Sequence, residues 1–191
     1  MDYTARLGEI QLKMARCFRI RYSMPSFEKC GGFLVIDQEG YRYNVAIVLV
    51  NQQGKVLLAR RSHQHSWQFA QGGLQEGETP LVALYRELYE ELGLRPWDVK
   101  VEAVTQGWLK YQLPDHLRRS EQNACIGQKQ KWFLLRLLSV DSTINLSTTN
   151  YPEFDRWRWV EYWYPLSQVI PFKRHVYRRA LERFYPFVKG Q

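Results

Sequence analysis

The stretch GGLQEGETPLVALYRELYEELGL, residues 72–94, joins a glycine loop to a segment that carries three closely spaced glutamates. Thr79 has the hydroxyl of a good helix N-cap, and Pro80 suits the first helical position, where its missing N–H has no intrahelical partner to lose. Gly93 is the residue type that most readily adopts the left-handed conformation after the last turn. These signals predict a helix over residues 80–92.

The predicted helix has two chemically different faces. Leucines at helical spacing form the side that we expect to face the core: Leu81, Leu84, Leu88 and Leu92. Three carboxylates at positions i, i+3 and i+4 gather on a second face: Glu87, Glu90 and Glu91. Clustered carboxylate oxygens suit Mg²⁺ or Mn²⁺, which also accept phosphate oxygens as ligands. A solvated acidic face is the simpler interpretation, but it leaves the fixed offsets of Gly72, Glu78 and Arg86 unexplained.

The stretch resembles the Nudix box, which reads Gly, five residues, Glu, seven residues, Arg-Glu, apolar, any residue, Glu-Glu, any residue, Gly, apolar. The matching positions are Gly72, Glu78, Arg86, Glu87, Leu88, Glu90, Glu91, Gly93 and Leu94. The resemblance implies an α/β Nudix fold, a single domain with a mixed β-sheet sandwiched between helices. It also implies a hydrolase of nucleoside diphosphates linked to another moiety, with two or more divalent ions, Mg²⁺ or Mn²⁺. The three box glutamates would be metal ligands, and Glu78 would pair with Arg86 to fix the loop onto the helix.

Five further segments resemble the bacterial RNA pyrophosphohydrolase branch of that family. They are GYRYNVAIVLVN from residue 40, ARRSHQHSWQFAQGG from 59, IGQKQKWFLL from 126, PEFDRWRWVEYWYP from 152 and FKRHVYRR from 172. The branch removes pyrophosphate or phosphates from triphosphorylated or diphosphorylated 5′ ends of mRNA. The product is a 5′-monophosphate, which initiates mRNA decay.

The same resemblance assigns roles outside the box. Glu153 corresponds to a fourth carboxylate that reaches the metals, and the general base is left open among Glu87, Glu91 and Glu153. The residues implied for substrate binding are Arg42, Arg61 and Lys173 for phosphates, Ser66, Tyr111 and Gln128 around the 5′ end, and Phe172 for base stacking. Three of these residues also have structural interpretations: Glu153 as a surface glutamate, Arg61 as a strand-end cation and Phe172 as core packing. Four aromatics are interpreted as core and scaffold: Trp157, Trp159, Trp163 and Tyr164.

Composition narrows the class of protein and of partner. The 191 residues are 45% apolar and 24% charged, and no stretch approaches the roughly 20 apolar residues of a membrane span. Without a signal-like N-terminus, we expect a cytoplasmic monomer with no membrane partner. A net charge of +8 favours polyanions. The expected partner is the 5′-phosphorylated end of single-stranded RNA, with no DNA specificity, and a protein partner is left open.

The chain divides into an N-terminal extension, residues 1–34, and a Nudix domain, residues 35–187. Branch members usually begin Met-Ile-Asp, whereas this chain reads Val35-Ile36-Asp37, so we hypothesise that translation naturally starts at Val35. The alternative for the extension is a genuine basic arm that touches RNA. Within the domain we expect strands over 43–50, 55–60, 99–106, 131–138 and 156–160, a long loop between residues 107 and 130, and a last helix over 174–185.

Two other functions are compatible with the motifs. A dinucleoside polyphosphate hydrolase of the diadenosine tetraphosphate type has a very similar stretch from Trp67 to Gly73. A non-catalytic RNA-binding module would keep the fold and lose the reaction. Retention of all three box carboxylates argues against the second of these, since degenerate Nudix modules typically lose them.

Overall fold

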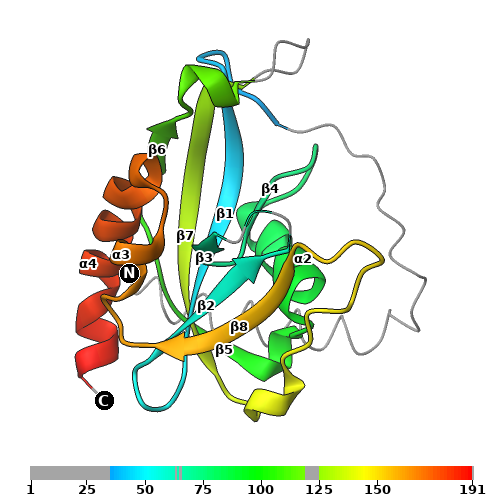
Figure 1. The fold of residues 1–191 in the computed structure, drawn as a ribbon, viewed down its shortest axis with the longest axis vertical. Coiled ribbons are helices and arrows are strands. Elements are labelled where there is room, and N and C mark those ends of the chain that lie inside the picture. Colours follow the sequence, from blue (N-terminus) through cyan, green and yellow to red (C-terminus); the bar gives the residue numbers. More distant parts are fainter. Residues whose placement is uncertain (1–34, 63, 65, 119–124, 191) are drawn as a thin grey trace.

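A computed structural model describes residues 35–62, 64, 66–118 and 125–190. A mixed sheet lies between helix α2 on one face and helices α3 and α4 on the other (Figure 1). The strands are β1 (Tyr41–Val50), β2 (Val56–Arg61), β3 (Trp67–Gln68), β4 (Gln71–Gly73), β5 (Val99–Val104), β6 (Leu109–Gln112), β7 (Gly127–Leu137) and β8 (Phe154–Val160). The helices are α2 (Pro80–Leu92), α3 (Pro165–Gln168) and α4 (Arg174–Lys189), with 3₁₀ turns η1 (Pro96–Asp98), η2 (Asp115–Leu117), η3 (Asp141–Thr143) and η4 (Pro171–Lys173). The expected α/β sandwich is confirmed.

The centre of the sheet is a parallel pair, β1 and β7. They run in register from Tyr41 opposite Gly127 to Val50 opposite Arg136, and the remaining strand pairs are antiparallel. The strand order is β3-β2-β1-β7-β5, with β4 paired to β1, β6 to β7 and β8 to β2. A parallel pair needs cover on both faces, which explains the continuous apolar run at the end of β1.

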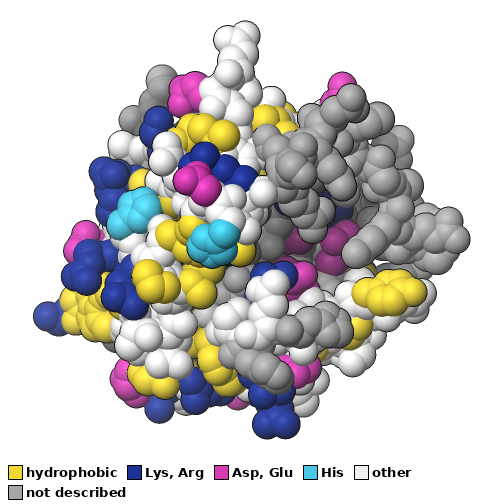
Figure 2. Space-filling view, turned by 45° about the horizontal axis from the view of Figure 1, so that its top comes forward, with side chains coloured by type: hydrophobic (Ala, Val, Ile, Leu, Met, Phe, Trp, Pro, Cys, Tyr) yellow, Lys and Arg dark blue, Asp and Glu magenta, His cyan; other side chains and the backbone are white. Residues whose placement is uncertain are grey.

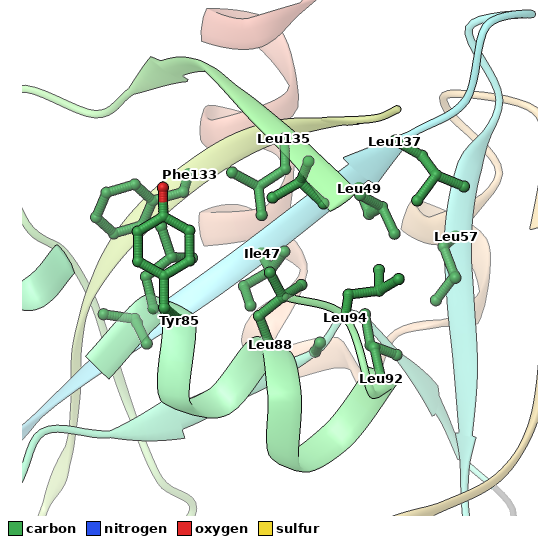
Figure 3. Close-up of a cluster of buried hydrophobic side chains, with 14 of the residues drawn as sticks. Ile47, Leu49, Leu57, Tyr85, Leu88, Leu92, Leu94, Phe133, Leu135 and Leu137 are labelled. Atoms are coloured by element: carbon green, nitrogen blue, oxygen red, sulfur yellow. The ribbon is translucent and has the colours of Figure 1, made fainter. Parts of the chain in front are cut away.

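Each face of the sheet has its own buried cluster. Under α2, Leu88 and Leu92 lie fully buried against Ile47 and Leu49 of β1 (Figure 3). The other cluster lies under α4 and contains the five residues that the sequence places on its inner side: Val176, Tyr177, Ala180, Leu181 and Phe184. Burial of these two helix faces fixes the helices to the sheet, since each large apolar side chain contributes about 1.5–3 kcal/mol.

Helix α2 begins and ends where its capping residues predict. The Val82 N–H donates to the Thr79 hydroxyl oxygen at 3.3 Å, and Pro80 takes the first helical position. Gly93 follows the last turn at φ 70°, and its N–H donates to the Tyr89 carbonyl at 2.9 Å. A side chain at Gly93 would also meet the backbone of Asn145. The helix that carries the box glutamates is therefore held at both ends by local chemistry.

The largest differences from the sequence expectations lie in the predicted loop and at the end of the last helix. The long loop predicted between residues 107 and 130 contains β6, and β7 begins at Gly127, because the start of β7 pairs with β1 on one side and with β6 on the other. Helix α4 continues past Pro186 to Lys189, since one missing N–H late in a helix leaves the final turn intact.

The extension over residues 1–34 lies outside the described residues. No helix in the described ranges is long and apolar enough to cross a membrane.

Candidate active site

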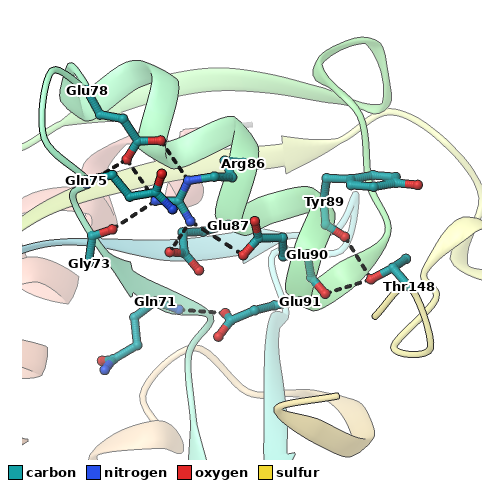
Figure 4. A network of polar contacts seen from close by, with 10 residues as sticks. All are labelled: Gln71, Gly73, Gln75, Glu78, Arg86, Glu87, Tyr89, Glu90, Glu91 and Thr148. Atoms are coloured by element: carbon teal, nitrogen blue, oxygen red, sulfur yellow. Dashed lines mark hydrogen bonds and ion pairs between the residues drawn. The ribbon is translucent and has the colours of Figure 1, made fainter. Parts of the chain in front are cut away.

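Arg86 of α2 joins the glycine loop to the helix (Figure 4). Its guanidinium donates to both carboxylate oxygens of Glu78 at 2.7 and 2.8 Å and to the Gly73 carbonyl at 2.8 Å. The expected Glu78–Arg86 pair is therefore present. Burial raises the pKa of Glu78, but the hydrogen bonds from Arg86, the hydrogen bond from the Gln75 backbone N–H and the charge of Arg86 together outweigh it and leave that pKa below its usual value. Both charges stay ionised, so the clamp is an ion pair at neutral pH.

Glu87 is packed against the glycine loop. Its carboxylate fills the space that a side chain at Gly72 would need, and one oxygen accepts from Arg86 at 2.6 Å. Burial raises the pKa of Glu87 from 4.5 to about 7, although Arg86 and Arg42 nearby favour the charged form. A buried carboxylate has lost the water that would stabilise its charge. It is therefore a strong ligand for a cation that takes the place of that water.

Glu91 and Glu90 complete the acidic face of α2. Glu91 is buried and accepts the backbone N–H of Gln71 at 2.8 Å, while Glu90 lies 3.4 Å from Arg86. Burial, together with the neighbouring charges of Glu87 and Glu153, raises the pKa of Glu91 well above its usual value. The box glutamates thus form a crowded group of like charges beside Arg86 and Arg42.

Glu153 reaches this group from the loop before β8. Its backbone carbonyl accepts from the Ser62 N–H at 3.0 Å, and the Ser62 hydroxyl donates to the Pro152 carbonyl at 2.9 Å. These bonds set the carboxylate beside Arg61, at 2.9 Å. Glu153 is exposed, as a surface glutamate would be, and it also lies close enough to Glu91 to raise the pKa of Glu91.

The four carboxylates supply oxygen donors of the kind that Mg²⁺ and Mn²⁺ prefer. In this arrangement the side chains are turned toward Arg86, Arg61 and the Gln71 N–H. Within the described ranges, no group of three or more acidic, histidine or cysteine side chains converges on one point. The residues fit a divalent ion by donor type and charge.

Cationic side chains lie opposite the carboxylates. Lys173 in η4 is only 7% exposed, and its Nζ lies 3.5 Å from the Gln68 side-chain oxygen and 5.6 Å from the centre of the Tyr111 ring. Burial, with Arg61 nearby, lowers the pKa of Lys173 to about 8. Glu91 and Glu153 act in the opposite direction. Lys173 therefore belongs to the same electrostatic site as the glutamates.

Arg42 of β1 lies on the other side of the glycine loop. Its guanidinium packs directly on Gly73, where a side chain would collide with it. Its Nε is buried and has no hydrogen-bond partner within the described part of the chain. Burial lowers the pKa of Arg42, and the charge of Glu87 partly offsets this effect. A buried donor without a partner is rare in proteins and marks a place where a ligand acceptor would be stabilised.

Several side-chain amides and a tyrosine form a hydrogen-bonded group near these charges. The Tyr111 hydroxyl donates to the Gln128 side-chain oxygen at 2.7 Å, and the Gln130 amide donates to Asn44 and Gln71 at 3.2 Å each. The sequence interpretation missed Gln130 and Gln71. Gln128 and Gln130 alternate along β7, so the period of a strand was the signal that places both on one face.

The remaining expected residues, Phe172 and Ser66, have separate contacts. The Phe172 ring lies 5.7 Å from Tyr111 and also packs on the α4-side core, so both of its proposed roles fit its position. Ser66 precedes β3, and its carbonyl accepts the Arg61 N–H at 2.9 Å. In Figure 2, acidic side chains lie deep in the visible face, and Lys and Arg side chains gather on the side of α3 and α4.

This fold, with a glycine loop clamped to an acidic helix, defines the class of protein. The NUDIX domain family model matches residues 40–184. The chain belongs to the Nudix family. Enzymes of this family typically depend on a divalent metal.

Curated relatives narrow the class further. An RNA pyrophosphohydrolase of Francisella philomiragia subsp. philomiragia is 59% identical over 154 residues, which cover 81% of this chain and 99% of that protein. An RNA pyrophosphohydrolase of Pseudoalteromonas translucida is 58% identical over 154 residues, which cover 80% of this chain and 90% of that protein.

Solved structures with the same fold are more distant in sequence. The E. coli dihydroneopterin triphosphate pyrophosphohydrolase aligns with a TM-score of 0.62 at 22% identity, over 78% of this chain and 97% of that chain. A C. elegans Ap4A hydrolase binary complex aligns with a TM-score of 0.56 at 19% identity, over 78% and 98%. At these identities the likeness extends to the fold alone.

Proposed function

We infer that this chain is an RNA pyrophosphohydrolase that acts on the 5′ end of RNA. The observation that carries the inference is the 59% identity over nearly the whole of a relative that bears this name. The site agrees in its chemistry, because a polyphosphate end needs cations beside an acidic, metal-binding face. We further propose that the substrate is a triphosphorylated or diphosphorylated mRNA end and that the product is a 5′-monophosphate.

In this proposal four carboxylates hold the divalent ions: Glu87, Glu90, Glu91 and Glu153. When bound, such ions neutralise charge on the phosphate oxygens and lower the pKa of a bound water. The clamp between Arg86 and Glu78 keeps α2 and the glycine loop in one position. The glutamates therefore have little freedom to move apart, which limits the entropy lost on binding.

The cations and amides would bind the substrate. Arg42, Arg61 and Lys173 are proposed to hold the phosphates, and the buried Nε of Arg42, without a partner in the described chain, supports its part. The polar residues Ser66, Tyr111 and Gln128 would surround the 5′ end. Phe172 would stack on a base, a common way to hold single-stranded RNA.

The general base is proposed to be one of Glu87, Glu91 and Glu153. A base must be deprotonated at the working pH, and burial disfavours this state at Glu87 and Glu91. Bound cations would restore it at both positions. Glu153 has the most exposed of the three side chains and pairs with Arg61.

The experiment that tests the function compares two substrates with one preparation and Mg²⁺. One is a short 5′-triphosphorylated RNA with an unpaired 5′ end, and the other is diadenosine tetraphosphate. We expect much greater kcat/KM on the RNA and no turnover of either after removal of Mg²⁺ with EDTA. Preference for the dinucleotide would overturn the inference and favour the metabolite hydrolase.

A further inference from the structure

A surface of cations and aromatic rings lies on the α3 and α4 side of the molecule. We call it the cation–aromatic surface and define it by Arg158, Trp163, Tyr164, Arg174, Arg178 and Tyr185. These residues come from β8, the turn before α3, and α4. Lys and Arg side chains gather on this side of the molecule in Figure 2. None of them belongs to the acidic site or to its proposed phosphate clamp.

The charge of this surface comes mainly from α4. Within Arg174–Lys189 five side chains are basic and one, Glu182, is acidic. Arg174 and Arg178 are exposed, and neither forms an ion pair with another described residue. Like charges four residues apart destabilise a helix, so a polyanion bound across them would remove an existing repulsion.

The aromatic part of the surface is open to solvent. Trp163 and Tyr164 are 41% and 39% exposed, so the expectation that these two rings belong to the core is wrong. Trp157 and Trp159 do pack on the α2-side core as expected. The Trp163 ring lies 5.2 Å from that of Tyr185, which fixes its position against α4.

Arg158 joins the aromatics to the edge of the active site. Its guanidinium lies 4.1 Å from the centre of the Trp67 ring and 5.2 Å from that of Tyr164. Trp67 directly follows Ser66, and Arg174 directly follows Lys173, two residues proposed to bind the 5′ end. The cation–aromatic surface therefore adjoins the residues proposed to bind the 5′ end at two places in the chain, Ser66-Trp67 and Lys173-Arg174.

The helical period gives the surface a direction. Arg174, Arg178 and Tyr185 lie at i, i+4 and i+11, so they form one stripe along α4 about 16 Å long. Proteins commonly bind a single nucleic-acid strand with a stripe of cations beside aromatic rings on which the bases stack. Arg183 is also exposed on α4 but lies about 140° around the helix from Arg178.

We propose that the cation–aromatic surface binds single-stranded RNA downstream of the 5′ end. Arg174 and Arg178 contact the backbone phosphates, and Trp163 stacks on a base. The proposal rests on the proposed function of the adjoining site. The exposed rings favour RNA over an anionic membrane as the occupant, because stacking uses the ring faces next to the cations.

The test measures kcat/KM on two RNAs with the same triphosphorylated 5′ end, a dinucleotide and a strand of about ten nucleotides. Arg178→Glu should lower the value for the longer RNA by about 5- to 10-fold and leave that for the dinucleotide within about 2-fold. Trp163→Ala should act in the same direction. Arg183→Glu is the matched control, with the same helix and charge change, and should leave both substrates within about 2-fold.

Equal effects of Arg178→Glu and Arg183→Glu on the longer RNA would overturn the proposal, as would a wild-type chain that does not prefer the longer RNA. Co-sedimentation with anionic phospholipid vesicles tests the other occupant. If Arg178→Glu weakens this co-sedimentation and leaves kcat/KM on both RNAs unchanged, the surface binds a membrane and the proposal is overturned. Failure of the proposed function is a separate result, in which the wild-type chain hydrolyses diadenosine tetraphosphate and neither RNA. Circular dichroism of each variant excludes unfolding as the cause of a loss.

Discussion

Gly72 shows how one residue type is required by its neighbour. Any side chain at this position would overlap the Glu87 carboxylate, which packs against the glycine backbone. Gly72→Ala should therefore displace Glu87 and reduce turnover by roughly 100-fold, since a displacement of about 1 Å in a catalytic group has effects of this size. Steady-state kinetics on triphosphorylated RNA measure the loss.

The matched control for Gly72 is Gly107, which has open space around its Cβ position and no positive φ. Gly107→Ala should leave turnover within about 2-fold of wild type. Similar losses in both variants would show that the packing of Glu87 on Gly72 is not what the reaction needs.

The buried glutamates make stability depend on pH. Burial raises the pKa of Glu87 from 4.5 to about 7 and that of Glu91 in the same direction. Between these pKa values the folded chain keeps protons that the unfolded chain releases. The stability contributed by the two protonated glutamates is therefore complete below about pH 4.5 and is lost as the pH rises toward about 7. For Glu87 the loss is on the order of 3 kcal/mol in metal-free protein. Urea unfolding in EDTA across this range measures it.

Glu87→Gln is the informative variant for this pH dependence. Glutamine keeps the size of the side chain and cannot ionise, so the decline of stability between about pH 4.5 and about pH 7 should become shallower. Added Mg²⁺ should restore stability above about pH 7 in the wild type, because it binds the folded state. An unchanged pH dependence in the variant would mean that Glu87 does not carry a raised pKa.

At the scale of elements, one arginine joins the glycine loop to helix α2. Arg86 bonds Glu78, Glu87 and the Gly73 carbonyl from a largely buried position. Arg86→Lys keeps the charge but removes the planar fork, so we expect the free energy of unfolding to fall by about 2–4 kcal/mol. Urea denaturation gives this value directly.

A surface ion pair provides the contrast for the clamp. Lys55 and Glu161 lie 3.4 Å apart with side chains that are 45% and 81% exposed. Lys55→Ala should change the free energy of unfolding by no more than about 1 kcal/mol. An Arg86→Lys loss as small as this would show that the clamp does not hold the loop to the helix.

The elements also show what the sequence can predict. Helix α2 is predictable to the residue because Thr79, Pro80 and Gly93 act within one turn of its ends. Strand β6 escapes prediction because its alternation of apolar and polar residues covers only four positions, and its stability comes from pairing with β7. The bonds from Gln130 to Asn44 and Gln71 span 86 and 59 residues of chain, so no local pattern contains them.

The whole molecule brings the site together from both faces of one sheet. The carboxylates stand mainly on α2, whereas Lys173 and Phe172 come from the turn before α4 on the opposite face. Strand β1 carries Arg42 and β2 carries Arg61 between these layers. The box motif alone therefore predicts the acidic half of the site, and the cationic half depends on how the sheet places distant segments.

Shortened chains test the role of residues 1–34. Val35 is tied into the domain, since its N–H donates to the Leu74 carbonyl at 3.3 Å and its carbonyl accepts from Tyr43 at 2.9 Å. A chain that begins at residue 35 should therefore keep the Tm and the kcat/KM on triphosphorylated RNA of the full chain. A chain that begins at residue 44 lacks buried Tyr41 and the guanidinium of Arg42, and should lose both stability and turnover.

Thermal unfolding and kinetics of the two shortened chains separate the hypotheses for residues 1–34. Equal Tm and equal kcat/KM in the chain from residue 35 support a domain that starts at Val35. The natural start of translation is tested separately by the intact mass of the native protein. A mass that includes Met1 would contradict a natural start at Val35. Equal Tm with a lower kcat/KM on RNA would instead support a basic arm that touches the substrate. That loss should shrink as salt rises, because contacts between cations and phosphates weaken with ionic strength.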